Sequence, residues 1–84
     1  MKLDEFKAKT LAILIVYEAK NEREKELISI LVSKINSLSM YTLADLFMTL
    51  YQIRENEKDI TEDFKNKVKE IALLASQLLD EASS

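Results

Sequence analysis

The chain has 84 residues, contains no glycine, proline, cysteine or histidine, and carries a formal net charge of −3. Without histidine and cysteine it lacks the commonest general base, the usual zinc ligands and any thiol nucleophile, and without glycine it cannot form a phosphate-binding P-loop. We therefore expect no enzymatic activity, no cofactor and no metal site.

The charge balance and the apolar runs also restrict the partners. An isoelectric point of about 4.9 argues against a nucleic-acid partner, because such binding depends on neutralising phosphates with Lys and Arg. The longest uncharged apolar run, Leu11 to Tyr17, has seven residues. A membrane span needs about 20. Asp4 and Glu5 interrupt the basic start that a secretory signal would have. We expect one soluble, cytoplasmic helical domain over residues 1–84.

The first predicted helix covers residues 2–19, because Leu, Glu, Lys and Ala are abundant and no helix breaker is present. Its core stripe at helical spacing consists of Leu3, Phe6, Thr10, Ile13, Leu14 and Tyr17. From Leu11 to Tyr17, however, there is no polar side chain to form a solvent-facing side. Three interpretations are open: a central helix contacted by all others, a buried strand without an evident pairing strand, or a helix whose outer side is covered by another chain.

The second predicted helix covers residues 22–36. Its apolar positions are Leu27, Ile30, Leu31 and Ile35. Asn21 and Glu24 have the spacing of a capping box, with an acceptor at the N-cap and a carboxylate three residues later. Nothing between Ala19 and Glu26 forbids helix, so residues 2–36 could instead form one long rod. An intertwined dimer would then cover the apolar stripes.

The third predicted helix covers residues 40–55, with Ser37 or Ser39 as its N-cap. Its core positions are Leu43, Leu46, Leu50 and Ile53. The apolar arc extends well beyond this stripe, through Met40, Tyr41, Ala44, Phe47, Met48 and Tyr51. Tyrosine and methionine are favoured at protein–protein contacts, so this surplus indicates either an interface or a wider core.

The fourth predicted helix covers residues 60–82, with Asp59 and Glu62 as a second capping box. Its apolar positions alternate steps of four and three: Phe64, Val68, Ile71, Ala75, Leu78 and Ala82. Lys65, Lys67 and Lys69 are spread around the helix among acidic neighbours, which is typical of a solvated side with ion pairs.

Short connections between four amphipathic helices predict an all-α antiparallel bundle, and the surplus apolar surface predicts that the bundle self-associates. The predicted interface residues come from the first and third helices: Leu11, Ala12, Ile15, Val16, Tyr41, Ala44, Met48 and Tyr51. We expect a non-enzymatic protein–protein interaction module, homodimeric and acting as a small adaptor or regulator.

Two alternatives stay open at this point. The stretch Tyr41–Phe47, YTLADLF, resembles the first helix of a helix-turn-helix and implies a DNA-binding regulator. The tight turn of that motif should follow within a few residues, whereas the apolar pattern continues through Ile53. The segment Glu55–Asp63 carries five acids and one lysine, as in an acidic inhibitor or immunity-type protein that binds a basic target. The same carboxylates also suit the N-terminus of the fourth helix.

Overall fold

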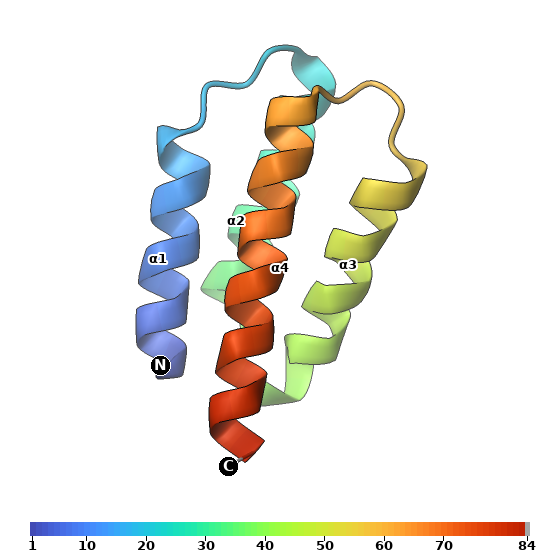
Figure 1. Cartoon of the computed structure of the whole chain (residues 1–84). Helices are drawn as coiled ribbons and strands as arrows, with labels where there is room; N and C mark the ends of the chain where they lie inside the picture. The colour runs from blue at the N-terminus through green and yellow to red at the C-terminus, as the bar shows by residue number, and fades with distance from the viewer. Residues whose placement is uncertain (84) are drawn as a thin grey trace.

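The structure is a computed structural model that describes residues 1–83, and this part of the chain forms four α-helices and one short 3₁₀ helix. The elements are α1 (Leu3–Val16), α2 (Glu22–Asn36), η1 (Met40–Thr42), α3 (Leu43–Asn56) and α4 (Glu62–Ser83). The helices run alternately in opposite directions as an antiparallel bundle (Figure 1). The predicted all-α four-helix architecture is confirmed.

Helix α4 contacts α1 and α3, and α1 contacts α4 and α2, which lies behind α4 (Figure 1). An ion pair between Lys34 Nζ and Asp45 Oδ2, 2.7 Å apart, connects α2 to α3. The run Leu11–Tyr17 therefore does not belong to a central helix, since Ile15 is 75% exposed and Val16 is 82% exposed. It is not a strand either, because α1 stays helical through Val16.

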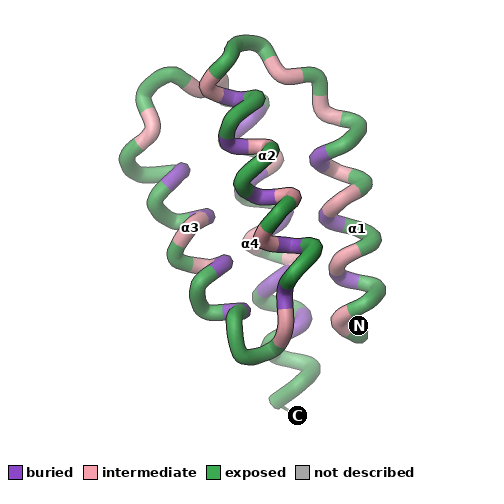
Figure 2. The backbone as a smooth tube through the Cα atoms, turned by 180° about the vertical axis from the view of Figure 1, so that it is seen from behind, coloured by how far each residue is buried: buried purple, intermediate pink, exposed green. Residues whose placement is uncertain are grey.

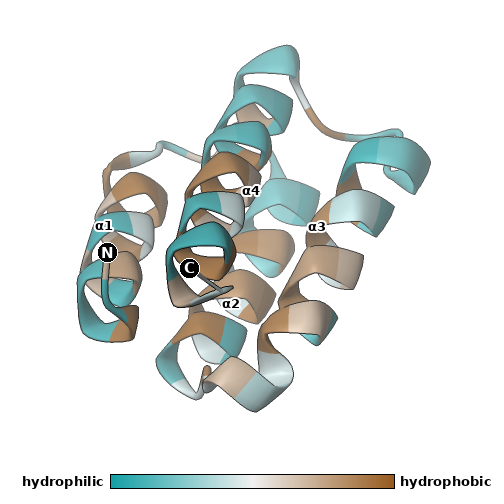
Figure 3. Cartoon of the chain, turned by 60° about the horizontal axis from the view of Figure 1, so that its bottom comes forward, coloured by the Kyte–Doolittle hydropathy of each residue, from teal (hydrophilic) through white to brown (hydrophobic). Residues whose placement is uncertain are grey.

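The core is a single cluster to which every α-helix contributes one stripe. Buried positions recur on the side of each helix that faces the others (Figure 2), and hydrophobic segments alternate with hydrophilic ones along the ribbon of each helix (Figure 3). The buried apolar residues are Phe6, Leu14, Leu27, Leu31, Ile35, Leu38, Leu43, Leu46, Leu50, Ile53, Phe64, Val68, Ile71, Ala75 and Leu78. Two predicted core positions are exposed: Ile30, about 100° from Leu31 around α2, and Ala82 in the last turn of α4.

The break between α1 and α2 excludes the long rod over residues 2–36. Helix α1 ends at Val16, three residues before the predicted end, because Tyr17 adopts extended backbone angles, with φ −68° and ψ 130°. Helix α2 has the predicted bounds, and the Glu24 backbone N–H donates to Asn21 Oδ1 at 2.8 Å, which confirms Asn21 as its N-cap.

The starts of α3 and α4 are set by different residues. The predicted helix over residues 40–55 is divided. Ser39, not Ser37, caps the 3₁₀ helix η1 in a capping box with Thr42, and α3 begins at Leu43, with Thr42 at its N-cap position. Helix α4 starts at Glu62, two residues later than predicted, and the Phe64 N–H donates to Thr61 Oγ1 at 3.2 Å. The N-cap must directly precede the first helical residue, so Thr61 takes this role and the predicted Asp59 capping box is wrong. Within residues 1–83, no helix has the combination of length and apolarity needed to cross a membrane.

Candidate interaction surface

The four predicted interface residues of α1 lie on two different sides of that helix. Ala12 and Val16 line a groove between α1 and α4, together with Ile13. Leu11 and Ile15 each lie two residues from Ile13, which turns them about 200° away around the helix. The structure therefore places Ala12 and Val16 beside α4 and directs Leu11 and Ile15 away from it.

The predicted interface residues of α3 lie on the side of the helix that adjoins α4 or farther outward. Tyr51 lines a groove between α3 and α4, together with Phe47. Ala44 and Met48 are exposed, and Tyr41 in η1 is 98% exposed. The large side chains of this set are thus available to a partner.

Leu73 on α4 connects the α3–α4 groove to a hollow beside Ile13 of α1, and the sequence pattern did not predict it as an interface residue. Its side chain is 61% exposed. Leu73 lies two residues from buried Ile71 and two from buried Ala75, which turns it about 200° away from each and hence outward. The available signal was a large apolar residue at an outward position of an otherwise regular amphipathic helix.

We call the outer side of α4 with its two flanking grooves the α4 face, which is turned toward the viewer in Figure 1. Its main apolar residues are Ala12, Ile13, Val16, Phe47, Tyr51, Leu73 and Leu74. These residues come from three helices, so the α4 face exists only in the folded chain.

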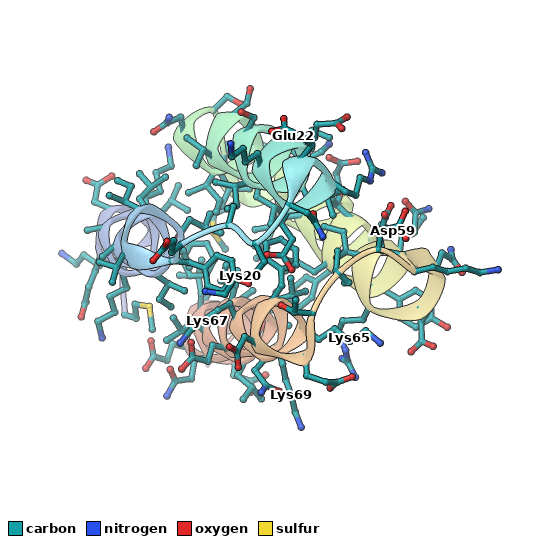
Figure 4. All side chains as sticks on the ribbon, turned by 90° about the horizontal axis from the view of Figure 1, so that it is seen from above. Lys20, Glu22, Asp59, Lys65, Lys67 and Lys69 are labelled. Carbon is teal, nitrogen blue, oxygen red and sulfur yellow. The ribbon has the colours of Figure 1, made fainter. Side chains whose placement is uncertain are left out.

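The two grooves of the α4 face differ in charge. The α3–α4 groove is lined by Arg54 and Lys69 and by no acidic residue. Neither cation forms an ion pair with any residue in the described part of the chain, and Lys69 extends away from the bundle (Figure 4). This groove therefore has two uncompensated positive charges.

The α1–α4 groove is more acidic. It is lined by the charged residues Glu18, Lys20, Asp63, Lys67 and Glu70. Lys67 Nζ lies 3.6 Å from Glu70 Oε2, and Lys20 Nζ lies 5.5 Å from the centre of the Tyr17 ring. Lys67 and Lys65 both pair with acids on α4, as the sequence indicated. The groove keeps a net charge of −1, from three acids and two lysines.

A buried carboxylate lies at the end of the bundle where the α1–α2 and α3–α4 connections meet. Glu24 is fully buried, with 0% exposure. One oxygen, Oε1, accepts from Tyr17 Oη at 2.7 Å and from the Lys20 backbone N–H at 2.9 Å. The other, Oε2, accepts from the backbone N–H and the hydroxyl of Thr61, both at 2.8 Å. The Glu24 side chain thus binds both connections instead of completing the predicted capping box with Asn21.

The surroundings of Glu24 indicate a structural role. Burial raises the pKa of the Glu24 carboxyl, but the hydrogen bonds from Thr61, Lys20 and Tyr17 outweigh it and hold the pKa below its usual value. Burial raises the pKa of the Tyr17 hydroxyl, whose ring packs edge-on against Phe64 at 5.5 Å. Within residues 1–83 every buried side-chain polar atom has a hydrogen-bond partner.

Arg23, the residue before Glu24, forms a bidentate ion pair with Glu57. Arg23 Nε donates to Glu57 Oε1 at 2.8 Å, and Arg23 Nη2 donates to Glu57 Oε2 at 2.6 Å. The Arg23 guanidinium lowers the pKa of the Glu57 carboxyl. Two of the five acids of the segment Glu55–Asp63 are therefore paired within the chain, Glu57 with Arg23 and Glu62 with Lys65.

Fold and surface together define a small all-α antiparallel four-helix bundle with an apolar face that spans three of its helices. No protein-family model, no curated protein and no solved structure matches the chain. In the described residues, no three acidic side chains gather in a way that could hold a metal ion.

Proposed function

We propose that this chain is a non-enzymatic, cytoplasmic interaction module that self-associates as a homodimer and acts as a small adaptor or regulator. The observation that carries the proposal is the α4 face, where exposed Tyr51 and Leu73 line one groove and exposed Val16 lines the groove on the other side of α4. Contiguous apolar patches on soluble proteins commonly mark interaction sites, because covering them removes apolar surface from water.

The composition of this face favours a protein partner. Phe47 and Tyr51 belong to the residue types enriched at the centre of protein–protein contacts. The four helices already use their buried stripes against one another, so no segment of residues 1–83 is left to cover the α4 face. A second copy is the simplest partner because it is present wherever the chain is.

The two alternative functions have less support. Helix α3 continues unbroken from Leu43 to Asn56, so the turn of a helix-turn-helix does not follow the stretch Tyr41–Phe47. In the acidic segment, Glu57 is bound by Arg23, and Glu62 and Asp63 lie in the first turn of α4, where they stabilise the helix. These local roles account for three of its five acids.

Sedimentation equilibrium over a series from low to high micromolar concentration tests the proposal. We expect the weight-average mass to rise from that of one chain toward that of two, and the melting temperature to rise with concentration, because a dimer dissociates as it unfolds. A chain that remains monomeric throughout the series contradicts the proposed self-association.

A further inference from the structure

We propose that two copies pair through their α4 faces about a two-fold axis parallel to α4, with the Leu73 side chains of both copies meeting at the axis. The proposal rests on the proposed self-association and adds to it the face, the axis and the contacting residues.

Four polar residues surround Leu73 and differ between its two sides. Lys69 and Ser76 line the α3–α4 groove with Leu73. Glu70 and Gln77 line the hollow on the α1 side with Leu73. Leu73 is therefore an apolar centre with a cation on the α3 side and a carboxylate on the α1 side, one helical turn before it.

A two-fold axis parallel to α4 exchanges these two sides. Lys69 of one copy then lies opposite Glu70 of the partner subunit, and the symmetry repeats the pair in the reverse sense. The two residues are consecutive in the chain, about 1.5 Å apart along the helix, so they meet at nearly the same level. The same rotation places Ser76 of one copy opposite Gln77 of the partner subunit, one turn after Leu73, where the two side chains can form a hydrogen bond.

The same rotation matches the apolar residues on either side of α4. Ile13 lines the hollow beside Leu73 on one side, and Tyr51 lines the groove beside Leu73 on the other. Rotation about an axis parallel to α4 lays Ile13 of one copy against Tyr51 of the partner subunit. Ile13 and Tyr51 lie on opposite sides of α4 within one chain, and this rotation brings them into contact across the interface.

The charges distinguish this axis from the other symmetric arrangement of the same two faces. An axis perpendicular to α4 through Leu73 would reverse the direction of α4 in the partner. Lys69 would then lie opposite Ser76 of the partner subunit, and Glu70 opposite Gln77 of the partner subunit, so neither charge would meet an opposite charge. The parallel axis lays the α3–α4 groove, with Arg54 and Lys69, over the α1–α4 groove, whose three acids and two lysines leave it a net charge of −1. Only the parallel axis places opposite charges across the interface, so the charge pattern favours the parallel axis.

The absence of cysteine allows a direct test with Leu73→Cys. Two thiols at a two-fold axis can reach disulfide geometry, so mild oxidation should link the two copies. Ile30→Cys is the control, because Ile30 is also exposed but lies on α2, on the far side of the bundle (Figure 1). We expect linkage through position 73 to be at least about tenfold faster, since only thiols held near each other meet repeatedly. Equal rates at the two positions would overturn the proposal.

A charge exchange tests the axis. Lys69→Glu or Glu70→Lys alone places like charges opposite each other twice per dimer, and we expect either change to weaken dimerisation by about tenfold. The double variant Lys69→Glu/Glu70→Lys restores both pairs and should return the dissociation constant close to that of the unmodified chain. Failure of the double variant to recover would exclude the parallel axis.

Ile15→Glu separates failure of this arrangement from failure of the proposed function. Ile15 lies on the side of α1 turned away from α4, so the arrangement predicts that this change leaves the dimer intact. If the unmodified chain dimerises and Ile15→Glu disrupts the dimer while Lys69→Glu does not, self-association stands and the α4 face is the wrong surface. If the unmodified chain is monomeric, both proposals fail.

Discussion

At the scale of single residues, Glu24 shows how a carboxylate can be buried without an opposite charge. A buried ion without partners is strongly unfavourable, and here four donated hydrogen bonds replace the water that Glu24 loses. Each carboxylate oxygen accepts a hydrogen bond from one backbone N–H, that of Lys20 or that of Thr61. A backbone N–H can only donate. The site therefore requires two acceptor oxygens.

The first prediction concerns Glu24→Gln, which keeps the size of the side chain. In either orientation the new amide nitrogen faces a backbone N–H, of Lys20 or Thr61, so we expect a loss of about 3 kcal/mol in the free energy of unfolding. Glu26→Gln, on the exposed side of the same helix, should change it by less than about 0.5 kcal/mol. Urea denaturation measures both, and equal effects would show that the Glu24 hydrogen bonds contribute nothing specific.

The second prediction concerns acid sensitivity. The folded chain lowers the pKa values of Glu24 and Glu57, so both groups contribute stability that is present above the unfolded value of about 4.3. That contribution is lost as the pH falls through their lowered pKa values. We expect the melting temperature to drop between about pH 4.5 and pH 2.5, and to drop less in Glu24→Gln. An identical pH profile for the two proteins would contradict this assignment.

At the scale of elements, the start of α4 depends on contacts with another part of the chain. Thr61 accepts from the Phe64 N–H as an N-cap and donates its hydroxyl hydrogen to Glu24. Asp59 contributes its backbone carbonyl, which accepts from Asn21 Nδ2 at 2.9 Å. The contacts of Thr61 with Glu24 and of Asp59 with Asn21 fix the end of the α3–α4 connection. Helix α4 therefore begins two residues after the start expected from its own sequence.

The third prediction compares the observed cap with the one that the sequence suggested. Thr61→Ala removes the cap and one Glu24 hydrogen bond, and we expect it to lower the free energy of unfolding by about 2 kcal/mol. Asp59→Ala keeps the backbone carbonyl and should change it by less than about 0.5 kcal/mol. Chemical denaturation of the two variants side by side distinguishes them, and the reverse order would restore Asp59 as the cap.

At the scale of the whole molecule, neighbouring residues of α1 serve different purposes. Leu14 is buried in the common core, while Ile15, the next residue, is 75% exposed. One residue turns the helix by about 100°, which is enough to move a side chain from the core to the surface. Apolar character alone therefore does not decide which residues of the run Leu11–Tyr17 hold the monomer together.

The fourth prediction uses this contrast. Leu14→Ala should lower the free energy of unfolding by about 2–5 kcal/mol through loss of contacts and formation of a cavity. Ile15→Glu should leave the monomer folded and change its stability by less than about 0.5 kcal/mol, because the new carboxylate remains in water. Thermal melting at a concentration where the chain is monomeric checks both. Unfolding caused by Ile15→Glu would mean that α1 is covered on its outer side within one chain.

Much of the secondary structure could be predicted from the sequence, because helical periodicity and N-caps depend on residues close together in the chain. The bounds of α2 and its cap Asn21 follow from such local spacing, whereas the sequence left Ser37 and Ser39 as alternatives for the next cap. The buried stripe of α4, from Phe64 to Leu78, follows from its regular steps of four and three. The absence of glycine and proline left no strong alternative to helix along the chain.

The tertiary structure alone decided where α1 ends, where α4 begins, and which outward side chains share a surface. Tyr17 lies beyond the end of α1 and donates a hydrogen bond to Glu24. Glu24 also accepts a hydrogen bond from the backbone N–H of Thr61, 37 residues away in the chain. Leu73 is one exposed leucine on its own helix and becomes the centre of the α4 face only because α1 and α3 pack on either side of it. Contacts between distant residues determine these features, and the local spacing of residue types carries no information about them.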